Sequence, residues 1–315
     1  MFRNTALKLF SGSSHPQLAS EVAKLLRMQV SELAIKKFAS NEIYVKPSET
    51  VRGCDVYIFQ TATHNVNEEL IELFIIIDAM KRSFAARIHV VMPHYGYARQ
   101  DRVATPREPI SAKVIANLIK SAGADHVITM NLHSDQAQGF FNFPVDNLTS
   151  SKMLAEYFLK KKMDNMVVVA PDTGAAKAAK RFSDMIGADL AILHKTRPAH
   201  NVSEVTQVVG DVTGKTCLII DDMVDTAGTV VQGKEALIKR GASPDVYLAT
   251  THAVFSDPAV SRLKAAQFKE VVVTDTIPLP PEKQFEGLTV LSVAPILAKT
   301  IQSVHKSKSV TSHNH

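Results

Sequence analysis

The sequence has no tryptophan, two cysteines and 6% aromatic residues, and it lacks any long apolar run. The longest apolar clusters, such as Leu73 to Ile77, end after a few residues, whereas about 20 are needed to cross a bilayer. No membrane segment is therefore expected. Arg3 and Lys8 near the start are not accompanied by a sustained apolar stretch or a small-residue cleavage site. Met1 to Phe10 is instead expected to form a first strand.

The scarcity of cysteine bears on the cellular compartment. Cys54 and Cys217 lie inside or beside apolar runs, which favours buried reduced thiols over a disulfide. A reducing, cytoplasmic location is expected.

The charge balance favours an anionic partner. The 315 residues include 36 Lys and Arg against 31 Asp and Glu, a net charge of +5. The basic residues are scattered, and neither a basic arm nor an aromatic and basic interleaving is present. Small phosphorylated molecules are therefore favoured over nucleic acid. A 45% hydrophobic content over this length is enough for two domains, each with its own core.

Short β-branched runs alternate with segments of helical periodicity, which indicates an α/β fold with mainly parallel sheets. The expected strands are Val56 to Gln60, Ile88 to Met92, His126 to Met130, Val167 to Ala170, Leu190 to Leu193, Cys217 to Ile220, Val246 to Thr250 and Val271 to Thr274. The expected helices include Glu68 to Phe84, Ser111 to Ser121, Lys152 to Lys161, Ala175 to Ile186 and Val230 to Arg240. Because the pattern fills both halves and Pro144 to Ser150 is rich in turn residues, two similar domains are expected, residues 1–148 and 149–315.

The strongest local signal is a strand, an acidic loop, a turn of small residues and a helix, from Leu218 to Arg240. The backbone N–H groups of Thr226 to Thr229 would face outward at the positive end of the helix, which suits a phosphate. Asp221 and Asp222 cannot face that phosphate unaided, because like charges about 4 Å apart repel by roughly 4 kcal/mol at an effective dielectric of 20. They are better suited to sugar hydroxyls and to Mg²⁺ or its waters. The segment therefore predicts a sugar-phosphate site.

Other polar residues follow predicted strands, where open α/β sheets place their ligands. Arg99 could hold phosphates as a planar fork, and His133 and Asp172 each follow a strand end. The polar stretch Lys195 to Gln207 has no periodicity and is expected to be a mobile loop. Taken alone, each of these segments is also compatible with an ordinary solvated loop.

Leu218 to Thr229 resembles the phosphoribosyl pyrophosphate loop shared by type I phosphoribosyltransferases and the class I ribose-phosphate pyrophosphokinases (phosphoribosyl pyrophosphate synthetases). Further motifs resemble the pyrophosphokinases in order and spacing, over about residues 8 to 312. They are Phe38 to Glu42, Val51 to Gly53, Tyr97 to Arg102, Pro109 to Lys113, Leu132-His133, Gln138 to Phe141, Pro171-Asp172 and Lys195 to Pro198.

The resemblance implies two phosphoribosyltransferase-like domains and transfer of the diphosphate of ATP to the C1 hydroxyl of ribose 5-phosphate. It implies catalytic Lys195 and Arg197 on a closing loop, and Mg²⁺ contacts at His133 and Asp172. The implied ATP site is Phe38, Ser40, Asn41, Glu42, Arg99, Gln100 and Asp101. The implied ribose 5-phosphate site is Arg197, Asp221, Asp222, Asp225, Thr226, Ala227, Gly228 and Thr229. It also implies a homo-oligomer, a hexamer built of dimers, with no nucleic-acid or membrane partner.

The sequence departs from the family pattern at several positions, namely Phe84, Val103, Asn131, Asn142 and the tail Ser309 to His315. Asn131 and Asn142 replace acidic residues and weaken the case for a second metal contact. Family members use the other regions for regulatory phosphate and nucleotide binding, so weaker activation by phosphate is expected. Two alternatives remain, a non-catalytic regulatory subunit of the same family and a type I phosphoribosyltransferase.

Overall fold

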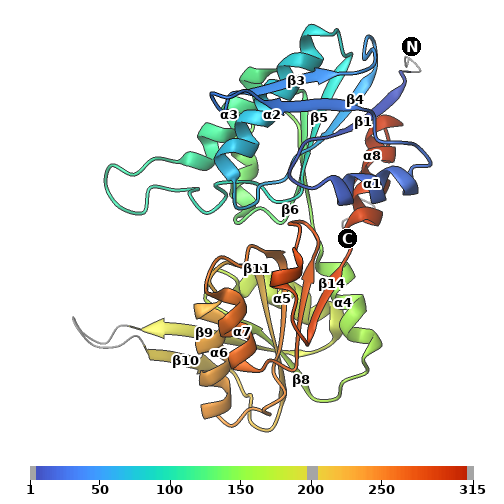
Figure 1. Cartoon of the computed structure of the whole chain (residues 1–315). Coiled ribbons are helices and arrows are strands. Elements are labelled where there is room, and N and C mark those ends of the chain that lie inside the picture. The colour runs from blue at the N-terminus through green and yellow to red at the C-terminus, as the bar shows by residue number, and fades with distance from the viewer. Residues whose placement is uncertain (1–4, 197–204, 311–315) are drawn as a thin grey trace. The chain divides into compact units, whose positions relative to one another are not determined.

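The computed structural model describes residues 5–196 and 205–310, which form two compact units (Figure 1). The first unit runs to Thr149 and takes in Thr276–Pro278 and the segment from Ser292 onward. The second consists of Ser150–Asp275 and Leu279–Leu291. Each unit is built on a mainly parallel sheet flanked by helices, so the predicted α/β class is confirmed.

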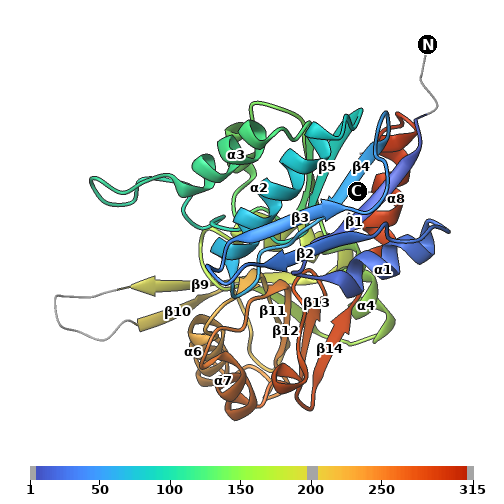
Figure 2. The same ribbon diagram turned by 45° about the horizontal axis from the view of Figure 1, so that its top comes forward.

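The sheet of the first unit is parallel throughout, with the strand order β1, β4, β5, β6, β7. These strands are β1 (Leu7–Ser11), β4 (Asp55–Phe59), β5 (Arg87–Met92), β6 (His126–Met130) and β7 (Val145–Leu148). The helical segments are α1 (Pro16–Leu25), α2 (Val66–Arg82), α3 (Ser111–Ala122), the 3-10 helix η1 (Asp135–Phe140) and α8 (Ala294–His305). A separate antiparallel hairpin, β2 (Leu33–Lys37) and β3 (Ile43–Pro47), packs on α2 (Figure 2).

The sheet of the second unit has the order β10, β9, β8, β11, β12, β13, β14, and only the β9–β10 pair in it is antiparallel among the described residues. Its strands are β8 (Met166–Ala170), β9 (Asp189–Thr196), β10 (Val205–Val209), β11 (Thr216–Val224), β12 (Tyr247–Ala253), β13 (Glu270–Thr274) and β14 (Leu288–Leu291). The helical segments are α4 (Ser151–Lys160), α5 (Ala176–Ile186), α6 (Gly228–Lys239), α7 (Ala259–Ala266) and η2 (Pro281–Lys283).

Side-chain alternation along the central strands explains why helices cover both faces of the second sheet. Val167 and Val169 belong to one core cluster with Leu237 of α6, whereas Val168 belongs to another with Phe182 of α5. Strands buried on both faces in this way read as continuous apolar runs. For this reason β8 and β13 could be predicted from the sequence.

Three predicted boundaries are wrong. The turn-rich stretch Pro144 to Ser150 contains β7, an edge strand that pairs with β6. The predicted loop Lys195 to Gln207 is strand at both ends, because β9 continues to Thr196 and β10 begins at Val205, and Figure 1 shows these arms reaching beyond the rest of the second unit. The acidic loop is also shorter than expected, since β11 continues to Val224 beside β12.

The last helix belongs to the first unit, whereas the division at residue 148 placed it in the second domain. α8 packs against α1, and Ser292 donates to Glu21 of α1 at 2.9 Å. Leu297 and Ile301 of α8 are fully buried. An alternating strand and helix pattern does not say which sheet a terminal helix covers. The sequence therefore could not show that α8 belongs to the first unit.

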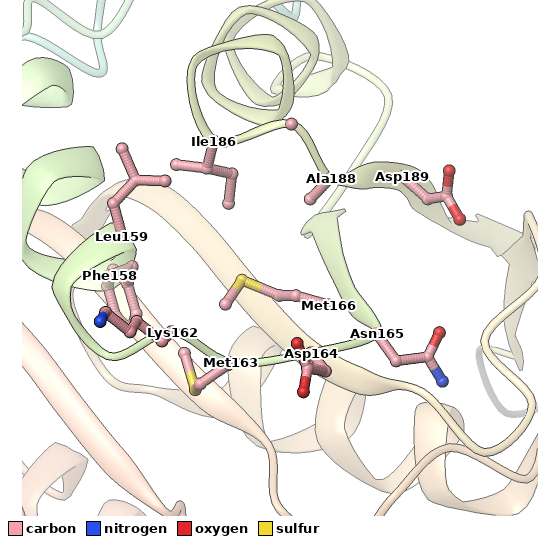
Figure 3. A pocket seen from close by; sticks show the side chains of 11 residues that line it. Phe158, Leu159, Lys162, Met163, Asp164, Asn165, Met166, Ile186, Ala188 and Asp189 are labelled. Atoms are coloured by element: carbon pink, nitrogen blue, oxygen red, sulfur yellow. The ribbon is translucent and has the colours of Figure 1, made fainter.

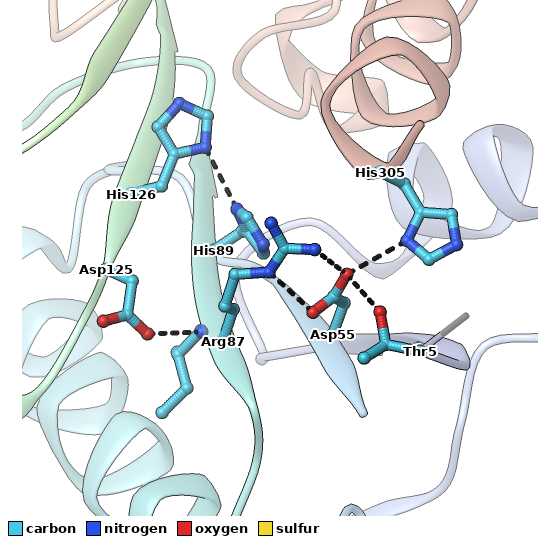
Figure 4. Close-up of polar contacts among 8 residues, drawn as sticks. Thr5, Asp55, Arg87, His89, Asp125, His126 and His305 are labelled. Atoms are coloured by element: carbon cyan, nitrogen blue, oxygen red, sulfur yellow. Dashed lines mark hydrogen bonds and ion pairs between the residues drawn. The ribbon is translucent and has the colours of Figure 1, made fainter. Parts of the chain in front are cut away.

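A buried carboxylate ties α8 to the start of β4 (Figure 4). Asp55 is fully buried and accepts hydrogen bonds from Thr5 Oγ1 at 2.8 Å, Arg87 Nε at 2.9 Å and His305 Nδ1 at 3.1 Å. The second Arg87 contact, Nη2 to Oδ2, measures 2.5 Å. Burial alone would raise the pKa of Asp55, but the hydrogen bonds from Arg87 and Thr5 outweigh it, and the pKa is lowered. Asp55 is thus held charged.

A histidine pair lies next to this carboxylate on β5 and β6. Nδ1 of His89 lies 3.1 Å from Nδ1 of His126, and Nε2 of His126 lies 3.2 Å from Asp146 Oδ2. Because Nε2–H of His126 donates to the Asp146 carboxylate, Nδ1 of His126 accepts, and we assign the proton between the two rings to Nδ1 of His89. His89 stacks on Tyr57 with ring centroids 4.3 Å apart. Burial, with repulsion from His126, lowers the pKa of His89 to about 3, so this imidazole is neutral.

Within the described ranges, no helix is long and apolar enough to cross a membrane. Cys54 and Cys217 are both free and buried, as the sequence predicted.

Candidate functional site

The predicted adenine-binding segment forms the tip of the β2–β3 hairpin. The turn is closed by Phe38 N–H donating to Glu42 O and by Asn41 N–H donating to Phe38 O, both at 2.9 Å. Asn41 takes a left-handed φ of 66°, a conformation that asparagine tolerates better than most residues. Ser40 donates to the Glu42 carboxylate at 2.6 Å. Phe38 is 56% exposed and meets Tyr44 edge to face, so one face of its ring is free to stack on a planar group.

Two contacts bring this tip and the Arg99 segment to the same end of α2. Lys37 pairs with Glu68, and Tyr97 donates to Asn67. Asn67 and Glu68 are neighbours in the first turn of α2, which follows the carboxyl end of β4. The predicted ATP-binding segments therefore gather at the carboxyl edge of the first sheet, where open α/β sheets bind ligands.

Within the Arg99 segment, Arg99 and Gln100 are exposed. The backbone carbonyl of Gln100 accepts from Ala112 N–H at 3.1 Å, and its side-chain oxygen accepts from Ser111 at 2.6 Å. Gln100 thereby caps the start of α3, a structural contact that the sequence did not predict. Asp101 follows at the beginning of the loop to α3.

His133 lies at the same edge, three residues beyond the end of β6. It is exposed. Asn131 has a left-handed φ of 43°, and its N–H donates to Leu148 O at 2.8 Å. The N–H of Leu132 donates to the side chain of Asn147 at 3.0 Å. These bonds fix the turn that presents His133.

In the second unit, the carboxyl ends of three adjacent strands bring the other predicted residues together. β9, β8 and β11 are neighbours in the sheet and run parallel. Asp172 follows β8, Asp221 to Val224 end β11, and the backbone of Lys195 lies near the end of β9, paired with Thr206. The side chain of Lys195 and all of Arg197 lie outside the described residues.

The Asp221 carboxyl turns inward and Oδ1 accepts the backbone N–H of Asp222 at 2.9 Å. Burial raises the pKa of Asp221 well above its usual range, and the nearby carboxylates of Asp222 and Asp172 add to the shift. Asp172 is exposed and accepts the N–H of Ala175 at 2.9 Å. Three carboxyl groups are thus gathered at one sheet edge, where a cation or sugar hydroxyls would relieve their repulsion.

The turn after β11 leads directly into α6. Ala227 precedes the helix with φ 61° and ψ 4°, a left-handed conformation that costs a non-glycine residue about 1 kcal/mol or more. Gly228 and Thr229 begin the helix, and the first N–H groups of a helix have no partner within it. Strand, turn and helix are thus arranged as predicted, with the helix starting two residues earlier.

Comparison with known proteins identifies the family. The N-terminal domain of ribose phosphate pyrophosphokinase matches residues 7–123, and the phosphoribosyl synthetase-associated domain matches residues 198–313. A ribose-phosphate pyrophosphokinase of Caldanaerobacter subterraneus is 48% identical over 97% of both chains. The chain belongs to the ribose-phosphate pyrophosphokinase family.

Two further members of this family show how far the likeness extends. The ribose-phosphate pyrophosphokinase of Bacillus subtilis is 46% identical over 97% of this chain and 96% of its own. The crystal structure of phosphoribosylpyrophosphate synthetase from Mycobacterium smegmatis superposes with a TM-score of 0.92 at 46% identity, covering 96% of this chain and all of that one.

The predicted Mg²⁺ contacts differ in how well they suit that ion. Mg²⁺ prefers oxygen ligands and is usually held by one or two carboxylates together with substrate phosphates and water. Asp172 fits this chemistry, whereas the imidazole of His133 is a ligand that transition metals prefer. Among the described residues, no cluster of three His, Cys, Asp or Glu forms a metal cage. Of the two predicted contacts, Asp172 therefore suits Mg²⁺ better than His133 does.

A polar network under the carboxyl edge of the first sheet was missed from the sequence. Glu72 of α2 accepts from Ser13 N–H at 2.7 Å and from Gln60 at 2.8 Å. A Cβ on Gly12 would lie 2.3 Å from Gln60 Oε1 and 2.8 Å from Glu72 Oε1, so a larger residue there would have to displace these hydrogen-bonded side chains. The Gly-Ser-Ser turn directly after a strand was the one sequence feature that could have indicated this network. No sequence feature indicated Glu72, because it reads as an ordinary polar position on a helix.

The structure also contains a cavity of about 340 Å³ at the opposite edge of the second sheet (Figure 3). Met166 at the start of β8, Asp189 at the start of β9, and the ends of α4 and α5 line it. The cavity is thus separate from the carboxyl-edge site.

Phe84, one of the departures from the family pattern, is at the surface and contacts an arginine. Phe84 is 65% exposed with a left-handed φ of 61°, and the Arg52 guanidinium lies 4.5 Å above its ring.

Proposed function

We propose that this chain transfers the diphosphate of ATP to the C1 hydroxyl of ribose 5-phosphate, giving 5-phosphoribosyl 1-pyrophosphate and AMP. The observation that carries the proposal is the carboxyl edge of β9, β8 and β11, where Lys195, Asp172 and the acidic turn come together on adjacent strands. The full-length likeness to named pyrophosphokinases supports it.

The geometry suggests how each segment contributes. In the reaction, the C1 oxygen forms a bond to the β-phosphorus of ATP, and the bond between that phosphorus and the α–β bridging oxygen breaks to release AMP. The proton of the C1 hydroxyl passes to water. Asp221, Asp222 and Asp225 are proposed to bind the ribose hydroxyls, and Thr226, Ala227, Gly228 and Thr229 the 5-phosphate. In the first unit, Phe38 would stack on adenine, Ser40, Asn41 and Glu42 would bind base and ribose, and Arg99, Gln100 and Asp101 would bind the phosphate end.

Lys195 and Arg197 are proposed to stabilise the transferring group. Phosphoryl-type transfer depends mainly on positioning and on stabilising spread negative charge. Cations brought to the β9 end would bind the transition state better than bound ATP. Asp172 and His133 are proposed as Mg²⁺ contacts, each within its own unit, and the ion would supply further charge neutralisation when bound with substrate phosphates.

An assay of AMP release tests the proposal. The purified chain should release AMP from ATP only when ribose 5-phosphate and Mg²⁺ are both present, with no nucleobase added. A phosphoribosyltransferase would need a base and would release no AMP, and a regulatory subunit would release none under any of these conditions. Either outcome would overturn the proposal.

Assembly and location stay predictions. We expect a hexamer built of dimers, which sedimentation of the purified protein would test, and a cytoplasmic location, which the buried free thiols favour.

A further inference from the structure

The segment that should receive the sugar phosphate lacks a cation of its own. Asp221 to Thr229 contains three aspartates and neither lysine nor arginine. A sugar phosphate carries up to two negative charges, and repulsion from these carboxylates opposes its approach. The partial charge of the α6 N-terminus, about half an elementary charge, is smaller than the charge of even one ionised aspartate in this turn. The family resemblance already places Arg197 at this site, and a second positive group from another element would offset more of this negative charge.

The first cation along α6 is already committed elsewhere. Lys234 is only 6% exposed, and its Nζ donates to the carbonyls of Ala266 and Gln267 at 2.7 and 2.5 Å. These carbonyls belong to the end of α7, so Lys234 holds α7 against α6 and directs its charge to the far end of that helix.

The opposite end of α7 supplies such a cation. Arg262 lies in the first turn of α7, and its Nη1 donates to the backbone carbonyl of Thr226 at 3.0 Å. The same atom would lie 3.5 Å from a Cβ on Gly228. The guanidinium thus lies directly on the turn that opens α6.

This contact also sets the direction of one backbone N–H group. The carbonyl of Thr226 and the N–H of Ala227 belong to one planar trans peptide and point in opposite directions. When Arg262 holds the carbonyl, the N–H of Ala227 points away from the guanidinium, and the negative end of the peptide cannot turn toward an anion. Ala227 itself is in the strained left-handed conformation, and the bond from Arg262 holds the peptide that precedes it.

We propose that Arg262 is a positioning residue for the 5-phosphate of the sugar substrate. It fixes the Thr226–Ala227 peptide with its N–H toward the phosphate and adds a positive charge beside this acidic turn. The inference rests on the proposed function, because it concerns the same sugar-phosphate site.

Steady-state kinetics on three variants tests this role. Arg262→Met removes the donor and the charge, Arg262→Lys keeps the charge, and Lys264→Met is the matched control, an exposed cation on the same helix. We expect Arg262→Met to raise KM for ribose 5-phosphate roughly 10- to 100-fold, the usual effect of losing one charged hydrogen bond. KM for ATP should stay unchanged. Arg262→Lys should recover part of the loss, and Lys264→Met should match the parent chain.

The outcomes separate this inference from the proposed function. If the parent chain releases no AMP with ribose 5-phosphate, the proposed function itself is wrong. If the parent chain is active and Arg262→Met keeps its KM for ribose 5-phosphate, Arg262 has no positioning role. An equal rise in KM for both substrates, or a fall in thermal midpoint with no KM split, would also overturn the proposal, since a general loosening of the second unit would explain it.

Discussion

The pair formed by Arg87 and Asp55 allows the sharpest test of the packing in the first unit. Arg87→Met keeps most of the aliphatic volume but removes both N–H groups that reach the fully buried carboxylate of Asp55. Removing one partner of a buried ion pair typically costs about 3–5 kcal/mol. The Arg87 side chain is 44% exposed, and Thr5 and His305 still donate to Asp55. We therefore expect a loss of about 2–3 kcal/mol in the free energy of unfolding.

Calorimetry of the purified variants measures this loss at fixed protein concentration. For a unit of this size, a loss of 1 kcal/mol lowers the midpoint by about 2–4 °C, so roughly 5–10 °C is expected. Arg82→Met is the control, because Arg82 pairs with Asp78 at 2.6 Å but is 78% exposed. Because that pair is exposed to solvent, its loss should lower the midpoint much less. If Arg87→Met costs no more than Arg82→Met, the reasoning about the buried carboxylate is wrong.

The pH dependence of the same variant provides a second check. In the parent chain the pKa of Asp55 is lowered, so the stabilisation is present above the ordinary value of about 3.9 and is lost as pH falls through the folded value. Without Arg87, burial would raise the pKa of Asp55 instead, and the folded variant would gain a proton more readily than the unfolded chain. The difference in stability should then shrink as pH falls from 7 toward 4. A constant difference would contradict this account.

Three further predictions concern catalysis and stability. Lys195→Ala should lower kcat and kcat/KM together, on the order of 10²- to 10³-fold; near-normal steady-state constants would refute its transition-state role. Asp221→Ala or Asp225→Ala should raise the ribose 5-phosphate requirement more than the ATP requirement in the same assay, and equal changes would count against the assignment. His89 stays neutral down to about pH 3, while the unfolded histidine gains a proton below about pH 6.5. The parent chain should therefore lose up to roughly 1.4 kcal/mol per pH unit between pH 6.5 and the folded pKa, and His89→Phe should reduce that slope in thermal midpoints; an unchanged slope would show that His89 is not responsible.

The sequence predicted the central strands well because burial on both faces leaves a continuous apolar run. β6 has the predicted limits, His126 to Met130, and β8 differs by one residue. The sequence did not predict a strand at the edge of a sheet or the full length of some strands. β7 lies at a sheet edge and carries Asp146 and Asn147, which read as turn residues. Asp221 and Asp222 read as loop, yet they continue β11 because β12 offers backbone partners beyond Ile220.

The candidate site was predictable where the chemistry is local in sequence. The acidic strand end, the turn and the following helix lie within one short segment, and their residue types indicate a sugar phosphate. Arg262 could not be found in this way, because it lies 36 residues from Thr226 and only the packing of α7 on α6 brings it close. Glu72 was missed for the same reason, since its partners Ser13 and Gln60 lie on other segments.

The return of α8 to the first unit affects the order in which the chain matures during synthesis. Domains usually fold in the order in which they leave the ribosome. Here the second unit lies between two parts of the first and ends at Leu291, so all of its strands emerge before α8 does. Asp55 is made early but receives the His305 bond only after all of the second unit has been made. The first unit to be started is thus the last to be finished, and until then the surface of α1 that α8 covers stays exposed on the nascent chain.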